Sequence, residues 1–108
     1  MYQYRAVVEN VVDGDTIDVS VDLGFKVGTR QRVRLARIDT PERGQPGYAA
    51  ARDFVRDVVL NKTVTIKTDK VSNWGYYLAD VTLEDGRNLS DTLMQAQLAK
   101  PYDGGHKE

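Results

Sequence analysis

Two short stretches of the sequence combine acidic residues with groups that suit a phosphate. Residues 13–16 read Asp-Gly-Asp-Thr, and residues 34–42 read Arg-Leu-Ala-Arg-Ile-Asp-Thr-Pro-Glu. Asp15 has the same parity as the apolar residues that follow it, so its carboxylate is expected to point inward, where it needs a partner or a cation. Taken alone, the first stretch is equally typical of a tight turn, and the second is more typical of a strand end than of a site.

Together the two stretches contain the groups that phosphodiester chemistry requires. If the first three strands form a meander, the start of the second and the end of the third lie at one end of the sheet, so Asp15 and Asp39 approach each other. Neighbouring carboxylates repel unless one is protonated or a cation lies between them. With the Thr40 carbonyl they form an all-oxygen ligand set that suits Ca²⁺ or Mg²⁺. Arg34 matches a phosphate, and Glu42 can orient or deprotonate a water.

Composition narrows the classes of function. The chain has 108 residues, which suits one domain with a modest core. It has no cysteine, which excludes disulfides and thiolate metal sites. Its one histidine, His106, lies in a glycine-rich tail, which removes most zinc and serine–histidine chemistry. No stretch resembles a signal peptide or a membrane span, so we expect a cytoplasmic protein with no membrane partner.

The distribution of charge is uneven. The net charge is −1 and the isoelectric point is about 5.8, which counts against a nucleic-acid partner. Residues 26–43, however, contain six basic and two acidic residues, and this range includes the whole second stretch. Charge alone favours a salt-bridged, solvated hairpin.

The pattern of apolar residues predicts the elements that position these groups. Five strands are expected, at residues 4–12, 15–23, 31–38, 62–68 and 76–83. Asp13-Gly14 predicts a hairpin turn between the first two. Residues 48–60 have helical periodicity with Asn61 as the C-terminal cap, and Ser90 is expected as the N-cap of a short closing helix.

This order of elements is typical of a mainly β (α+β) fold, a five-stranded Greek-key barrel of the OB type. One helix lies between strands 3 and 4, and a short helix follows near the C-terminus. A small α+β sheet is the alternative architecture. We expect a single domain, residues 1–102, and a flexible tail, residues 103–108.

The joint pattern of motifs resembles the staphylococcal nuclease (thermonuclease) family. The resemblance runs from Tyr4 to Tyr102 and depends on four stretches in family order: VVDGDTI, RVRLARIDTPE, YYLADVTLEDGRNL and LAKPY. It implies an OB-fold, Ca²⁺-dependent phosphodiesterase that cuts DNA or RNA into 3′-phosphorylated fragments.

The resemblance also implies roles for the acids at the metal. Asp15 and Asp39 would be carboxylate ligands of Ca²⁺, and Thr40 would be a carbonyl ligand. Asp13 matches an acid that lies beside the metal without binding it.

Three further residues have implied roles toward the substrate. Arg34 matches an arginine that binds the phosphate and stabilises the developing charge. Glu42 matches the residue that activates or orients the attacking water. Tyr102 matches tyrosines that contact the nucleotide after the last helix.

The sequence departs from the family pattern in one loop. The family usually has Asp-Lys-Tyr-Gly-Arg where residues 72–76 here read Ser-Asn-Trp-Gly-Tyr. Asn73 replaces a phosphate-contacting lysine, Trp74 keeps an aromatic face for a base, and Tyr76 replaces a second catalytic arginine. Loss of such a cation costs on the order of 10²- to 10⁵-fold in rate.

We therefore expect a Ca²⁺-dependent nuclease, weakened by Tyr76, that acts on DNA or RNA as a monomer and prefers single strands. The alternative is a catalytically silent OB-fold module that binds a nucleotide or a single strand. Ca²⁺-dependent cleavage distinguishes the two.

Overall fold

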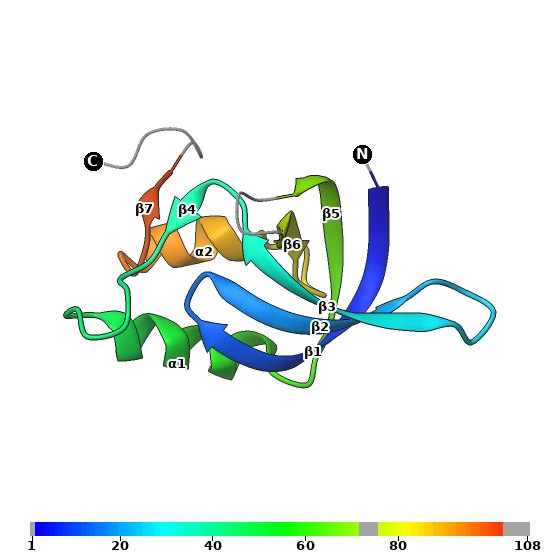
Figure 1. Ribbon diagram of the computed structural model, residues 1–108. Coiled ribbons are helices and arrows are strands. Elements are labelled where there is room, and N and C mark those ends of the chain that lie inside the picture. The colour runs from blue at the N-terminus through cyan, green and yellow to red at the C-terminus, as the bar shows by residue number, and fades with distance from the viewer. Residues whose placement is uncertain (1, 72–75, 103–108) are drawn as a thin grey trace.

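The computed structural model describes residues 2–71 and 76–102 of the chain. Its main feature is a closed barrel with the strand order β1-β2-β3-β6-β5 (Figure 1). These strands are β1 (Tyr2–Asp13), β2 (Thr16–Asp22), β3 (Gly28–Leu35), β5 (Thr63–Val71) and β6 (Tyr77–Thr82). Neighbouring strands are antiparallel except β3 and β6, which are parallel. The predicted mainly β, OB-type fold is confirmed. The expected tail, residues 103–108, lies outside the described residues.

The turn between β1 and β2 packs closely on the first helix. It consists of Gly14 and Asp15, between the paired residues Asp13 and Thr16, one residue later than predicted. A Cβ atom at position 14 would lie 2.8 Å from the Cβ of Ala51, which belongs to α1 (Tyr48–Val59). Only glycine fits this approach without a shift of the backbone, because real Cβ atoms do not pack at such a distance.

The predicted third strand, residues 31–38, is broken in the structure. β3 ends at Leu35, and a separate strand, β4 (Ile38–Asp39), pairs with β7 (Lys100–Pro101). Between them Arg37 adopts a left-handed conformation with φ 71°, which turns the chain away from the barrel. The continuous strand was therefore a wrong prediction, because alternation of apolar residues does not reveal a turn that side chains elsewhere stabilise.

Arg37 is held in this turn by a network of polar contacts. Its guanidinium donates to Asp80 Oδ1 (3.2 and 3.0 Å), to Asp91 Oδ1 (3.3 Å) and to Asn88 Oδ1 (3.2 Å). These contacts join the turn to β6 and to α2 (Leu89–Gln95). They direct β4 back across the end of the barrel, next to β7 (Figure 1).

Helix α1 covers one side of the barrel with its apolar face. Ala51, Val55 and Val59 are fully buried on that face. The helix ends at its cap residue Leu60, and Asn61 follows in the left-handed conformation with φ 64°. Asparagine tolerates this conformation, so Asn61 ends the helix one position beyond the cap itself.

The cap of α2 differs from the prediction. Asn88, not Ser90, is the N-cap, and its side chain accepts a hydrogen bond from the Asp91 N–H (3.1 Å). Ser90 is buried, and its hydroxyl donates to the carbonyl oxygen of Ala36 (2.9 Å), so it stabilises the turn after β3 instead. Neither helix in the described part of the chain is long and apolar enough to cross a membrane.

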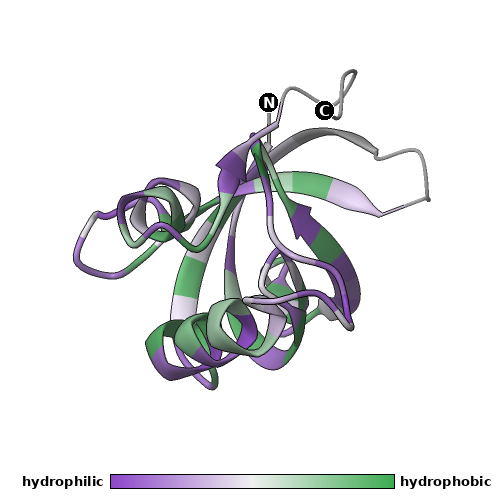
Figure 2. Ribbon diagram, turned by 90° about the vertical axis from the view of Figure 1, so that its left-hand side faces the viewer, coloured by the Kyte–Doolittle hydropathy of each residue, from purple (hydrophilic) through white to green (hydrophobic). Residues whose placement is uncertain are grey.

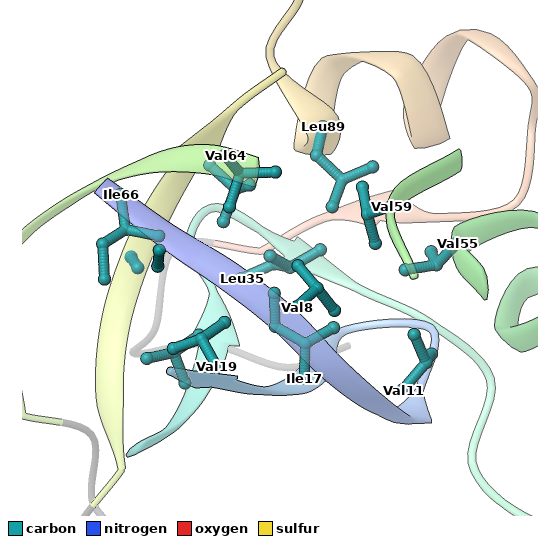
Figure 3. Close-up of a cluster of buried hydrophobic side chains, with 14 of the residues drawn as sticks. Val8, Val11, Ile17, Val19, Leu35, Val55, Val59, Val64, Ile66 and Leu89 are labelled. Atoms are coloured by element: carbon teal, nitrogen blue, oxygen red, sulfur yellow. The ribbon is translucent and has the colours of Figure 1, made fainter. Parts of the chain in front are cut away.

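The core fills the barrel and continues beneath both helices. Hydrophobic and hydrophilic residues alternate along the strands, so each strand turns one face inward (Figure 2). Figure 3 shows ten labelled core residues: Val8, Val11, Ile17, Val19, Leu35, Val55, Val59, Val64, Ile66 and Leu89. This packing makes the barrel a rigid support for the polar residues at the end formed by β4 and the β1–β2 turn.

Candidate active site

The turn between β1 and β2 carries a buried carboxylate. Asp15 is 7% exposed. Its side chain accepts hydrogen bonds from the Thr40 N–H (3.2 Å) and from the Thr16 hydroxyl (3.2 Å). Its backbone carbonyl accepts from the Leu35 N–H (2.8 Å). The ends of β3 and β4 are thus tied to this one residue.

Arg34 lies between two acids that are distant in the sequence. Its Nη2 atom lies 3.3 Å from Asp15 Oδ2 and 3.2 Å from Asp39 Oδ1. Its Nη1 atom donates to the carbonyl of Ile38 (3.3 Å). The side chain of Arg34 is 10% exposed and that of Asp39 is 22% exposed, so the group is largely removed from water. Asp15 and Asp39 therefore meet at one end of the barrel.

The charge of Asp15 is only partly compensated by the protein. Burial raises the pKa of its carboxyl above the ordinary value. The Arg34 charge and the hydrogen bond from the Thr40 N–H oppose this effect, while the nearby Asp39 adds to it. An additional positive charge at this point would therefore be favourable.

The chemistry of the donors fits a hard divalent cation. Asp15 and Asp39 offer carboxylate oxygens and Thr40 a carbonyl oxygen, with no nitrogen or sulfur. The Thr40 hydroxyl is also buried, and it has no hydrogen-bond partner within residues 2–71 and 76–102. In the same part of the chain, no three acidic, histidine or cysteine side chains cluster closely enough to hold a metal alone. A cation here would need backbone carbonyls and water to complete its coordination.

Glu42 lies at the surface, three residues after Asp39, in the loop that joins β4 to α1. The residue is exposed. Its N–H donates to Gln45 Oε1 (2.7 Å), and its carbonyl accepts from the Gln45 N–H (2.9 Å), so the backbone forms a closed turn. This turn restrains the backbone of Glu42, which follows Asp39 and Thr40 closely in the sequence. Its side chain is exposed to solvent.

Asp13 is positioned by a residue of α1. The Tyr48 hydroxyl lies 2.8 Å from Asp13 Oδ1 and 3.2 Å from the carbonyl oxygen of Val12. Tyr48 is 8% exposed and begins α1, so the helix fixes the acid at the end of β1. Asp13 thus lies beside the turn that holds Asp15, two residues away.

Tyr102 lies over the central arginine. The pairing of β7 with β4 brings it there, and its N–H donates to the Arg37 carbonyl (2.8 Å). The Arg34 Cζ lies 5.2 Å from the centre of the Tyr102 ring, a cation–π distance. The side chain is half-buried, so the ring packs against Arg34 and is also partly accessible to solvent.

The remaining residues expected to contact substrate lie before β6. Tyr76 has its ring 5.9 Å from the Cζ of Arg32. Asn73 and Trp74 lie outside the described residues. Tyr76 therefore neighbours the arginine that precedes Arg34 by two positions on β3.

Three residues with structural roles at the site were not predicted from the sequence. Arg32 has the same parity as Arg34, and this spacing could have indicated that both share one face of a strand. Tyr48 begins a predicted helix, but its contact with Asp13 joins residues 35 apart in the chain. No local pattern indicates the role of Arg37, because its partners belong to β6 and the start of α2.

The fold and the site define a class: a small OB-type barrel that presents two acids and a phosphate-matching arginine at one end. The family described as "Staphylococcal nuclease homologue" matches residues 32–107, which include Arg34, Asp39, Thr40 and Glu42. The chain belongs to this family, and the resemblance seen in the sequence is confirmed.

Individual relatives agree with this assignment. The chain is 34% identical over 96 residues to an uncharacterized endonuclease of Escherichia coli O157:H7, and the match covers 89% of this chain and 60% of the relative. It is 39% identical over 80 residues to a micrococcal nuclease of Shigella flexneri (72% and 42%). It is 34% identical over 101 residues to a thermonuclease of Staphylococcus intermedius (86% and 54%). The chain thus spans between 42% and 60% of the length of these relatives.

Proposed function

We propose that the chain is a metal-dependent nuclease that hydrolyses phosphodiester bonds of single-stranded DNA or RNA, acts as a monomer, and uses Ca²⁺. The main supporting observation is the convergence of Asp15 and Asp39 on the guanidinium of Arg34. The names of three of the relatives, an endonuclease, a micrococcal nuclease and a thermonuclease, support the class of reaction.

Asp15, Asp39 and the Thr40 carbonyl would hold the cation. A bound divalent cation supplies a Lewis acid that polarises the phosphate and neutralises its charge. When the two carboxylates are compensated in this way, Arg34 no longer has to neutralise them alone. Its N–H donors can then bind the phosphate. Hydrogen bonds between a planar guanidinium and a phosphate are strong where both are partly buried.

Glu42 would orient or deprotonate the attacking water. It is an exposed carboxylate, and the closed backbone turn with Gln45 holds it in a constant place next to β4. An acid in contact with solvent can accept a proton from water and return it to the bulk. Its proposed role is therefore separate from that of the metal-binding carboxylates Asp15 and Asp39.

Tyr102 would contact the nucleotide next to the phosphate. Its ring lies beside Arg34 and borders solvent, and an aromatic ring can stack on a base or a sugar without regard to sequence. This feature favours single strands, whose bases are accessible for stacking.

Cleavage of a labelled single-stranded oligonucleotide tests the proposal. We expect Ca²⁺-dependent cutting that stops with a chelator. Glu42→Gln and Arg34→Ala should each lower the rate by about 10²-fold or more. Arg56→Ala, which removes an exposed arginine near Asp53 on α1, is a matched control and should cut normally. Cutting that survives in both Glu42→Gln and Arg34→Ala would refute the assignment.

The second candidate function is a module that binds a nucleotide or single strand without cutting it. The observation that favours it is Tyr76, a neutral side chain next to Arg32, at the position where the family pattern implies a second arginine. In that case a nucleotide with two phosphates should raise the melting temperature only with Ca²⁺, and no cleavage should appear. Tyr76→Arg should then create cleavage, whereas a nuclease that is merely weakened should gain rate from a measurable baseline.

A further inference from the structure

The outer face of the barrel carries two neighbouring rows of side chains that run across the strands. One row contains Arg34 and the other contains Arg32. Register pairs Thr16 with Arg34 and Asp18 with Arg32 across β2 and β3. Paired residues share a face of the sheet, so Arg32 points to the same side as Arg34. β6 runs parallel to β3 with Tyr77 opposite Val33, which places Tyr76 beside Arg32.

Arg32 is held in a defined orientation from both sides. Its Nε lies 2.7 Å from Asp18 Oδ1 and its Nη2 lies 3.2 Å from Asp18 Oδ2. Its Cζ lies 5.9 Å from the centre of the Tyr76 ring. The side chain nevertheless remains 42% exposed. A guanidinium has five N–H donors, so a pair of contacts with one carboxylate leaves others for a ligand.

The surroundings of Arg32 suit a polar chain. It borders a surface hollow of about 550 Å³ that is lined by polar and charged residues, among them Glu9, Asp18 and Arg30. Arg32 and Arg34 are two positions apart on β3, so their backbones lie about 7 Å apart. Two consecutive phosphates of an extended nucleic-acid strand can span such a separation.

We propose that Arg32 binds the phosphate next to the one that Arg34 binds, so that β3 follows the backbone of a single strand with two arginines. This inference rests on the proposed function, because it takes a single-stranded nucleic acid as the ligand. Tyr76 then acts as a positioning residue, since its ring lies beside the guanidinium without touching the reacting atoms, whereas Asp18 holds the guanidinium only until a phosphate replaces it.

A salt bridge with a purely structural role would behave differently. If Arg32 serves only to pair with Asp18, removing either partner has the same consequence for stability and none for binding. If Arg32 binds phosphate, the two substitutions act in opposite directions. Arg32→Ala removes a phosphate contact, whereas Asp18→Asn removes a negative charge that competes with the phosphate for the same guanidinium.

The test is the salt dependence of binding of a fluorescein-labelled oligothymidylate, measured by anisotropy with Ca²⁺ present. Every variant carries Glu42→Gln, which is expected to prevent cleavage during the measurement. For single strands each phosphate contact contributes about 0.7 to the slope of log K against log salt concentration. We expect Arg32→Ala to weaken binding and reduce the slope by about 0.7, Arg32→Lys to keep the slope, and Asp18→Asn to tighten binding.

Arg87→Ala is the matched control, because Arg87 is also an exposed arginine paired with one acid, Asp85 (2.7 Å). It borders a different surface hollow, and its slope should equal that of the parent. An unchanged slope in Arg32→Ala, with thermal unfolding like that of the parent, would overturn the inference, as would a parent that fails to bind the oligonucleotide. If the protein without Glu42→Gln fails to cut in the Ca²⁺-dependent cleavage assay while the slopes are as expected, the nuclease proposal is removed and Arg32 remains as a phosphate contact.

Discussion

The guanidinium of Arg34 lies 3.3 Å from the carboxylate of Asp15, and each side chain is only 10% exposed. The two residues are 19 positions apart in the chain, on β3 and in the β1–β2 turn. A charged pair in such surroundings depends on each partner, because a buried charge without compensation is costly. The stability of this end of the barrel and the chemistry proposed for it therefore share one interaction.

Arg34→Met should unfold more easily than the parent, by about 3–5 kcal/mol, because it leaves two acids uncompensated. Ca²⁺ should recover a large part of this loss, since a cation can take over the compensation of Asp15 and Asp39. Chemical denaturation with and without Ca²⁺ measures both effects. In the parent, Ca²⁺ should raise the free energy of unfolding by a smaller amount than in Arg34→Met. Equal shifts in the two proteins would contradict this, because they would show that the cation does not take over the compensation that Arg34 provides to these carboxylates.

Tyr48→Phe should lower the free energy of unfolding by about 1–2 kcal/mol, because the hydroxyl that contacts Asp13 and the Val12 carbonyl is lost while the ring remains. It should also weaken Ca²⁺ binding, followed as the shift of melting temperature with Ca²⁺ concentration, since Asp13 loses its anchor beside the turn. Tyr77→Phe is a suitable control, because Tyr77 is 41% exposed. If both substitutions have the same small effect, Tyr48 does not position Asp13.

Gly14→Ala should destabilise the protein by about 1–3 kcal/mol, because the new methyl group has no room. Its Cβ would lie 2.8 Å from the Cβ of Ala51 and 3.1 Å from the Cγ2 of Thr40. Ala51→Gly by itself should cost about 1 kcal/mol, since glycine disfavours a helix.

The double variant Gly14→Ala with Ala51→Gly gives the matching control. It should be more stable than the sum of the single losses predicts, because one clash has been removed. Strict additivity in a double-mutant cycle by urea denaturation would contradict the close approach of the turn to α1.

Arg37→Ala should be less stable than Arg37→Gly, the reverse of the usual order. Both substitutions remove the contacts with Asp80, Asp91 and Asn88, but only glycine adopts φ 71° without strain. The difference should be about 1 kcal/mol in favour of glycine. Denaturant unfolding of the two variants measures it, and a more stable Arg37→Ala would mean that the turn relaxes once the side chain is gone.

Much of the fold follows from local patterns. The alternation of Ile17, Val19 and Val21 predicts a strand with one buried face, and all three are buried in the barrel. The apolar face of residues 48–60 predicts the helix that packs against it. These elements are readable because burial of one face imposes a period of 2 on a strand and 3.6 on a helix. Asp15, expected on the inward face of the second strand, is buried, but it lies in the turn before β2 begins and pairs with Arg34.

Turns and caps depend on residues that local patterns do not connect. Ser90 is a good N-cap by type, yet Asn88 occupies that position because Ser90 is used for a hydrogen bond to Ala36, 54 residues away. The break between β3 and β4 has the same origin, since the partners of Arg37 follow it by 43 residues or more. Contacts of this kind exist only once the barrel has closed.

For the site, the sequence by itself determined the chemical groups: acids, an arginine, a glutamate and a tyrosine, in an order typical of one family. Only the tertiary structure decided how they meet. It placed Arg34 between Asp15 and Asp39, put Tyr102 over that arginine through the pairing of β7 with β4, and aligned Arg32 with Asp18 and Tyr76 on the outer face. The physical reason is that side-chain type is a local property, whereas the distance between two charges depends on strand register and on the closure of the barrel.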